Sequence, residues 1–289
     1  TWNAANGQLL ARQFGHSGRI TRLCATTDGK SLLSLSADKS LRRWSAYGGL
    51  DFYQPGTRSE YVYAFGRSHD GKTIGMGAPD GQVSVWSNDG KMQGMVKCLP
   101  EALNALAFSP DGSRFVGVNW GSEACIWDSR SGQLVRRLDG LTSGGSGCAY
   151  SPDGRWIALA LKTGWVGVWD AHTGLLTHKL DMPGGSYNVA FSPDGSLLAA
   201  AGNKGALAIW ETSGFQLKIS QPAHEQGIYA LAFSPDGKQL LTAGEDKTGR
   251  IWNLADGRLV KEFKGHAQRI WSVAWSPDGA TVAAGSSFE

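Results

Sequence analysis

The sequence has few charged residues, and the charges it carries nearly cancel. Asp, Glu, Lys and Arg make up 18% of the 289 residues, and the formal net charge is +3. Nucleic-acid-binding domains usually concentrate many basic residues on one face, so this balance argues against nucleic acid as the main partner. No stretch approaches 18 consecutive apolar residues, and the composition therefore predicts no membrane-spanning helix.

Cysteine is also scarce, and the four cysteines suggest no metal chemistry. Cys24, Cys98, Cys125 and Cys148 form no Cys-x-x-Cys pair. Their spacing fits neither a zinc site nor a dense disulfide framework. We therefore expect free, buried thiols, no metal and no cofactor. The N-terminal residues show no basic leader followed by an apolar run, so no signal peptide is predicted and a cytoplasmic location is expected.

What the chain has in abundance is an internal repeat. Seven aspartates, each followed by glycine, lie at positions 28, 70, 111, 153, 194, 236 and 278, and five of the seven copies read Ser-Pro-Asp-Gly. A second series has the same period: tryptophans lie at positions 2, 44, 86, 127, 169, 210 and 252. Both series advance by 41 or 42 residues per step. Two independent series with one period indicate a repeat of structural units.

Each repeat has the pattern of four short strands. In the sixth repeat the apolar run 228–233 is followed by a Ser-Pro-Asp-Gly turn, and the runs 239–243, 249–252 and 258–263 are separated by further turn residues. Proline presets φ for such turns, aspartate bonds to the local backbone, and glycine accepts positive φ. Four strands in about 42 residues are typical of one blade of a β-propeller, and no window has the helical period.

The repeat therefore predicts an all-β fold, a seven-bladed β-propeller of four-stranded antiparallel blades. We expect a single domain, 1–289, with blades at approximately 16–54, 58–96, 99–138, 141–180, 182–219, 224–263, and 266–289 plus 1–13. The last blade needs Trp2 and residues 8–11 as its outer strands, so the N- and C-terminal strands should share blade seven and close the ring. The frame places a further tryptophan near position 294, which suggests a piece of a longer protein.

The repeats resemble those of the WD-repeat family over essentially the whole chain. The Trp-Asp dipeptide occurs at Trp127-Asp128 and Trp169-Asp170, and the regular Ser-Pro-Asp-Gly turns look like those of bacterial members. The resemblance implies a buried polar tetrad of His, Ser or Thr, Asp and Trp in well-formed blades. Two blades match it with identical spacing: His16, Ser34, Asp38 and Trp44, and His224, Thr242, Asp246 and Trp252. The other five blades depart from the tetrad, so packing should hold them.

The resemblance also implies a partner-binding face, formed by the loops that enter the first strand of each blade. Carried over position by position, the expected contact residues include Arg19, Tyr61, Tyr63, Asn104, Trp120, Lys162, Tyr187, Tyr229, Glu245, Arg269 and Trp271. Six of the 21 positions expected at this face are aromatic, against 10% in the chain. Tyrosine, tryptophan and arginine dominate binding hot spots. The alternative is that some of these aromatic side chains only cap the centre of the fold.

We therefore expect a non-catalytic scaffold that binds a protein or peptide, either as a monomeric propeller or as one domain of a larger protein. The Asp-Gly pairs lack the spacing of a calcium loop, and Glu245 is the one acid expected near the channel, so an enzyme is not predicted. The alternative function is a nucleic-acid-binding or ligand-sensing propeller attached to a larger bacterial signalling protein. Arg19, Lys162 and Arg269 would give such a face its positive charge.

Overall fold

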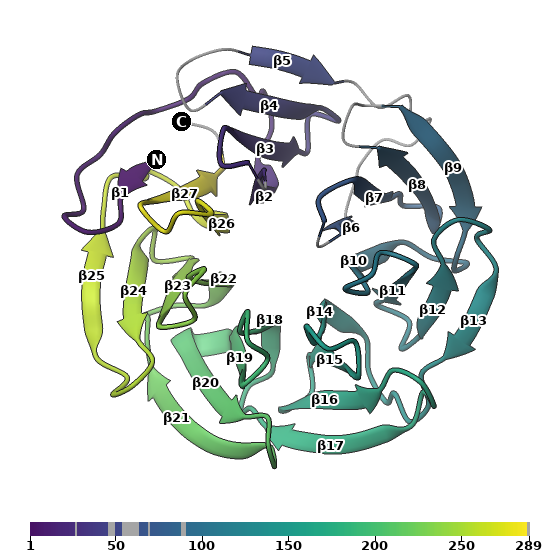
Figure 1. Cartoon of the computed structure of the whole chain (residues 1–289). Coiled ribbons are helices and arrows are strands. Elements are labelled where there is room, and N and C mark those ends of the chain that lie inside the picture. Colours follow the sequence, from purple (N-terminus) through teal and green to yellow (C-terminus); the bar gives the residue numbers. More distant parts are fainter. Residues whose placement is uncertain (27, 46–49, 54–63, 69, 88–90, 288–289) are drawn as a thin grey trace. The chain divides into compact units, whose positions relative to one another are not determined.

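The computed structural model describes residues 1–26, 28–45, 50–53, 64–68, 70–87 and 91–287. These residues form 27 strands and one short 3-10 turn, η1 (Asn203–Gly205). The strands pair into seven separate antiparallel sheets, of which six have four strands and one has three (Figure 1). The chain is therefore an all-β protein of the seven-bladed β-propeller class, as the repeat predicts. Among the described residues, no helix is long and apolar enough to cross a membrane.

Two compact units make up the chain. The first comprises Thr1–Gly56, Lys204–Ala206 and Gln221–Glu289, and the second comprises Thr57–Asn203 and Leu207–Ser220. The prediction of a single domain spanning 1–289 stays a prediction.

The first unit contains blades one, six and seven. Blade one consists of β2 (Ile20–Ala25), β3 (Ser31–Ser36), β4 (Leu41–Ser45) and β5 (Leu50–Tyr53). Blade six consists of β22 (Ile228–Phe233), β23 (Gln239–Gly244), β24 (Gly249–Asn253) and β25 (Leu259–Phe263). Blade seven consists of β26 (Ile270–Trp275), β27 (Thr281–Ser286) and β1 (Trp2–Asn3).

The second unit contains blades two, three and four and most of blade five. Blade two has β6 (Ala64–Arg67), β7 (Thr73–Gly77), β8 (Gln82–Ser87) and β9 (Met92–Lys97). Blade three has β10 (Leu103–Phe108), β11 (Arg114–Asn119), β12 (Ala124–Asp128) and β13 (Leu134–Arg137). Blade four has β14 (Gly145–Tyr150), β15 (Trp156–Leu161), β16 (Trp165–Asp170) and β17 (Leu176–Asp181). Blade five has β18 (Ser186–Phe191), β19 (Leu197–Gly202), β20 (Ala206–Glu211) and β21 (Gln216–Pro222).

The two ends of the chain share blade seven, as expected, but its fourth strand does not form. Strand β1 pairs with β27 through Trp2–Val282 and Asn3–Thr281. Residues 8–11, predicted as the outer strand, make one isolated bridge, between Leu9 and Trp2. β1 has only two residues, so residues 8–11 have little strand to pair with, although the amide of Asn3 donates to the carbonyl of Gln8 at 2.8 Å.

The Ser-Pro-Asp-Gly turns are held by their own side chains. In blade six the Ser234 hydroxyl donates to Asp236 Oδ1 at 2.7 Å, and its oxygen accepts the amide of Gln239 at 2.9 Å. Asp236 also accepts the amide of Lys238 at 3.1 Å. Gly237 has a φ of 69°, a conformation that side chains of other residues disfavour. The repeated tetrapeptide is thus a structural device that reverses the chain between the first two strands of a blade.

The hydrophobic core lies between neighbouring blades. In the second unit Trp169 of blade four is fully buried in a cluster with Val116 and Ile126 of blade three. In the first unit Trp2 and Trp275 of blade seven pack with Ile251 of blade six. Replacing such a buried aromatic side chain by alanine typically costs about 3–5 kcal/mol. Interblade packing therefore supplies most of the stability in blades that lack the polar tetrad.

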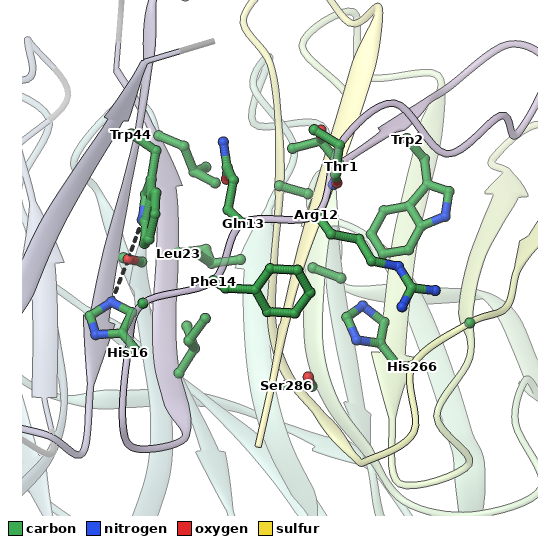
Figure 2. Close-up of a pocket in the computed structure, with 18 of the residues that line it drawn as sticks. Thr1, Trp2, Arg12, Gln13, Phe14, His16, Leu23, Trp44, His266 and Ser286 are labelled. Atoms are coloured by element: carbon green, nitrogen blue, oxygen red, sulfur yellow. Dashed lines mark hydrogen bonds between the residues drawn. The ribbon is translucent and has the colours of Figure 1, made fainter. Parts of the chain in front are cut away.

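Both tetrads are continuous hydrogen-bonded chains. In blade one Trp44 Nε1 donates to Ser34 Oγ at 2.6 Å, and Ser34 Oγ lies 2.7 Å from His16 Nε2 (Figure 2). His16 Nδ1 lies 2.9 Å from Asp38 Oδ2. All groups are satisfied when Nδ1–H donates to the carboxylate and Nε2 accepts from the hydroxyl.

Blade six repeats this arrangement with the same geometry. Trp252 Nε1 donates to Thr242 Oγ1 at 2.8 Å, Thr242 Oγ1 lies 2.8 Å from His224 Nε2, and His224 Nδ1 lies 2.9 Å from Asp246 Oδ2. Each tetrad therefore joins the tryptophan of the third strand to the loop that enters the first strand.

The tetrad carboxylates are strongly stabilised in their charged form. Burial opposes ionisation of Asp38, but hydrogen bonds from Ser40, His16 and two backbone amides outweigh it and lower the pKa of Asp38 to about 2. Burial likewise opposes ionisation of Asp246, and hydrogen bonds from His224 and Thr248 lower its pKa to about 2. Burial is the main cause that lowers the pKa of His16, which keeps that ring neutral.

We predict that the tetrads make the protein sensitive to acid. A carboxylate whose pKa is depressed from 3.8 to about 2 stabilises the folded state above pH 3.8, and this contribution disappears as the pH falls towards 2. Each tetrad should lose roughly 2 kcal/mol in this window. Urea unfolding of the wild type and of Asp38→Asn at several pH values should show a shallower acid slope for the variant. Exposed Asp256→Asn serves as the control, and identical slopes in all three proteins would refute the tetrad as the cause.

A second prediction concerns the tryptophan of blade two. Trp86 Nε1 is buried and makes no hydrogen bond among the described residues, because Met76 stands where blade one has Ser34. Trp44→Phe breaks a hydrogen bond, whereas Trp86→Phe removes an unsatisfied donor. Trp44→Phe should therefore destabilise the protein by about 1–3 kcal/mol more than Trp86→Phe, measured by urea unfolding. Equal losses would contradict this account.

Candidate partner-binding face

A β-bulge in the first strand of the blades positions the predicted contact residues. In six blades the register between the first and second strands shifts across one residue of the first strand. The residues passed over are Thr21, Asn104, Ser146, Tyr187, Tyr229 and Trp271. A bulge leaves the extra residue outside the pairing and re-aims its side chain. One of the three frame positions expected at the face in each blade is therefore the residue of the first strand that lies outside the strand pairing.

In the first unit, two of these bulge residues stack on each other. The rings of Tyr229 (β22) and Trp271 (β26) are 4.6 Å apart between centroids and inclined by 16°. Arg19, from the loop before β2, places its guanidinium carbon 4.9 Å from the centroid of the Trp271 ring. Trp271 Nε1 donates to Ser287 Oγ at 2.8 Å. The stack therefore joins blades six, seven and one, with its tryptophan held by a hydrogen bond.

An ion pair borders the stack. Arg269 Nη2 lies 2.9 Å from Glu245 Oε1, and the Tyr229 hydroxyl donates to Glu245 Oε2 at 3.3 Å. The side chains of Arg269 and Glu245 are 52% and 30% exposed. Arg19, Tyr229, Glu245, Arg269 and Trp271, here called the first-unit cluster, are thus linked to one another. Their charges sum to one excess positive charge, because Glu245 neutralises Arg269 and leaves Arg19.

In the second unit, the predicted residues Trp120 and Lys162 contact each other. Lys162 Nζ lies 3.4 Å from the centroid of the Trp120 ring, a close cation–π contact. The tryptophan side chain is nevertheless 48% exposed. Gly144 allows this arrangement, because a Cβ at that position would overlap the carbonyl oxygen of Trp120. The Trp120–Lys162 pair therefore presents a large aromatic surface to solvent on a rigid support.

The remaining predicted residues differ in what they can offer a partner. Asn104 is buried, and its amide donates to the carbonyl of Gly145 in the next blade at 3.1 Å, which is a structural role. Tyr187 occupies a bulge and is half-buried. Tyr61 and Tyr63 lie outside the described residues. The Glu245–Arg269 ion pair could not be predicted from the sequence, because those residues are 24 positions apart and belong to different blades.

A cavity that the sequence did not predict lies at the side of blades one and seven, within the first unit. It measures about 330 Å³, which is the small end of the range for ligand pockets. Figure 2 shows His16 and Trp44 on one side, His266 on the other, and Phe14 between them. Phe14 is 68% exposed although it lies at this cavity. Ser287, which accepts the hydrogen bond from Trp271, also lines this cavity, so the cavity adjoins the first-unit cluster.

Three of the described histidines and two of the cysteines have structural surroundings. His16 and His224 belong to the tetrads, and His178 packs 4.4 Å from the ring of Phe215. Burial raises the pKa of Cys98 to about 12 and that of Cys125 to about 11, so neither thiol is a ready nucleophile. No group of three or more His, Cys, Asp or Glu in the described part of the chain could hold a metal ion. The contacts suited to binding a partner are those between the exposed aromatic and cationic side chains.

Comparisons with known proteins match these observations. A family model described as "WD domain, G-beta repeat" matches residues 7–45, 176–211, 215–253 and 257–287, half of the chain. The chain is 26% identical over 158 residues to a periodic tryptophan protein 2 homolog of Schizosaccharomyces pombe, covering 47% of this chain and 18% of that protein. It is 26% identical over 178 residues to apoptotic protease-activating factor 1 of Rattus norvegicus, covering 60% and 14%.

The name of a third relative states the protein with which that relative interacts. The chain is 23% identical over 173 residues to the SIR4-interacting protein SIF2 of Saccharomyces cerevisiae, covering 57% of this chain and 31% of that protein. The chain thus spans less than a third of the length of each of these three relatives. All three are eukaryotic proteins, so they lend no support to the expected bacterial type.

Proposed function

Because the chain belongs to the WD40 family of WD domain, G-beta repeats, we propose that it is a protein-interaction scaffold. In this proposal, the first-unit cluster and the Trp120–Lys162 pair each bind part of a peptide or protein segment. The single observation that carries it is the Tyr229–Trp271 stack with Arg19 on it, because an ordered aromatic and cationic surface of this kind is typical of binding hot spots. The name of the relative SIF2 is consistent with such a role.

The local structure supports a binding role over a purely structural one. A side chain that only fills the core would be buried, whereas Arg19 and Arg269 are exposed and Trp120 is about half exposed. The bulge leaves Tyr229 and Trp271 outside the strand pairing. Stacking and the ion pair hold these side chains in place before binding, which reduces the entropy that a partner must overcome. That the two sets share one face stays a prediction.

The finer features expected from the sequence enter this proposal as predictions. We infer a non-catalytic protein, a cytoplasmic location and a protein or peptide partner. A bacterial source also stays a prediction.

Substitution of the exposed aromatic residues tests the proposal. Peptides selected from a displayed random library for binding to the wild-type chain should bind Tyr229→Ala or Trp120→Ala at least about tenfold more weakly, measured by fluorescence anisotropy. Melting temperatures should change little, because neither side chain is fully buried. Leu134→Ala is the matched control, since Leu134 is 49% exposed on the outer strand β13 of the blade that carries Trp120. Unchanged affinity in both aromatic variants would overturn the proposal.

The alternative, a nucleic-acid-binding propeller, is less well supported by the contacts. Base stacking needs an open aromatic face, but Arg19 and Tyr229 both lie against Trp271, which leaves Trp120 as the exposed ring. Phosphate recognition also needs several free cations, and Arg269 is paired with Glu245.

Salt dependence separates the two functions. Raising the salt from about 50 to about 200 mM should weaken the selected peptides less than about tenfold, because few cations take part. Nucleic acid bound through six or more phosphates would lose about a thousandfold or more over the same range. A single-stranded oligonucleotide that binds more tightly than the peptides, with that steep dependence, would favour the alternative.

A further inference from the structure

One position of the repeat carries a polar atom that packing does not require. The residue that ends the first strand is Phe108, Tyr150, Phe191, Phe233 and Trp275 in blades three to seven. Three of these five are phenylalanine, so an aromatic ring without a hydroxyl meets the packing need. The polar atom of Trp275 is satisfied, because its Nε1 donates to the carbonyl of Ala232 at 3.0 Å. Tyr150 is the exception in this set.

The hydroxyl of Tyr150 is buried and has no hydrogen-bond partner among the described residues. Burial is the main cause that raises the pKa of Tyr150, so the group stays protonated and can act as a donor. A buried hydroxyl without a partner is destabilising, and native proteins rarely keep one without a reason.

A cavity of about 350 Å³ adjoins Tyr150 within the second unit. It lies at the Ser-Pro-Asp-Gly turns of blades three and four, on other elements than the proposed binding residues. Two further donors line it: the guanidinium of Arg114 and the imidazole of His172 are exposed and make no hydrogen bond or ion pair within the described part of the chain. The donor groups of Tyr150, Arg114 and His172 therefore have no acceptor among the described residues.

The carboxylates at the cavity are already engaged. Asp111 accepts the hydroxyls of Ser109 and Ser113 at 2.6 and 2.7 Å. Asp153 accepts the hydroxyl of Ser151 and the amide of Arg155. These bonds belong to the turns and leave the donors on Arg114, Tyr150 and His172 to an acceptor from outside the chain. The two negative charges repel any anionic ligand, and a ligand with two negative charges about twice as strongly as one with a single charge.

We propose that this cavity is a binding site for a single carboxylate, held by Arg114, His172 and the hydroxyl of Tyr150. Arginine matches a carboxylate through two parallel hydrogen bonds, and a tyrosine hydroxyl adds a third donor. Arg114 lines the cavity together with Tyr150 and is exposed, so its side chain can move to admit the ligand. The carboxylate belongs either to a small organic acid or to a peptide.

Titration with acetate tests this site directly. In a protein with ¹³C-labelled tyrosine, the NMR signal of the Tyr150 ring is identified by its loss in Tyr150→Phe. This signal should shift as sodium acetate is added, and the shift should reach saturation. Acetamide, which has the same shape without the charge, and sodium chloride should leave it in place. Arg114→Gln should weaken the acetate affinity at least about tenfold. Equal responses to acetate and acetamide, or tighter binding of inorganic phosphate, would overturn the proposal.

Stability provides a second and independent test. Without ligand, Tyr150→Phe should have a melting temperature equal to or above that of the wild type, because it removes an unsatisfied hydroxyl and keeps the ring. Tyr187→Phe is the matched control. A clear fall in melting temperature for Tyr150→Phe, or a crystal structure in which one ordered water satisfies the hydroxyl in the presence of acetate, would show that the hydroxyl serves the fold.

The source of the carboxylate is distinguished by peptides. The probe is a tripeptide of glycine with a free C-terminus. Tighter binding of this peptide than of acetate, and than of the same peptide with an amidated C-terminus, would identify a peptide carboxylate. Equal affinity of acetate and the free tripeptide would identify a small acid. The test is independent of the peptide experiments above, because Arg114 and Tyr150 belong to neither the first-unit cluster nor the Trp120–Lys162 pair.

Discussion

Apolar packing between neighbouring blades is the interaction on which the rest of the structure depends. Five of the seven repeats lack the complete polar tetrad, yet the tryptophans of blades three, four and five are among the most buried residues of the chain. A β-sheet of four short strands cannot bury its apolar faces alone, so each blade is stable only against its neighbours. The third-strand tryptophan supplies the large apolar area that this contact needs, which explains why it recurs when other tetrad members are lost.

Such packing requires the strands of every blade to pair in the same register. The bulge in the first strand leaves one residue outside this pairing, so its side chain can vary. The bulge recurs in six blades, while its residue varies from Ser146 to Tyr187 and Trp271. Variation at a position of fixed geometry is what a recognition surface needs, because side chains can change without a change in backbone. The Tyr229–Trp271 stack uses two successive bulges, so it depends on the spacing between blades as well as on the residues.

The sequence predicted the parts of the structure that local chemistry determines. The number of blades and the turn positions followed from the period, because turn residues and buried tryptophans act within one repeat, and the two tetrads followed from the resemblance to the WD-repeat family. The prediction of a fourth strand in blade seven was wrong, because β1 has only two residues and residues 8–11 make a single bridge to it. The burial of Asn104 and the Glu245–Arg269 ion pair join different blades, and a pattern within one repeat carries no information about such contacts.

The repeat also gives an internal standard for deciding what a polar group is for. Trp86 and Tyr150 both carry a buried polar atom without a hydrogen bond among the described residues, but for opposite reasons. Trp86 is the residue that the repeat prescribes, and its partner position has changed to Met76, so its unsatisfied atom reflects the loss of a tetrad. Tyr150 is itself the departure, since phenylalanine occupies its position in three other blades. A polar atom added where packing asks for none, beside unpaired donors, is better explained by a ligand than by the fold.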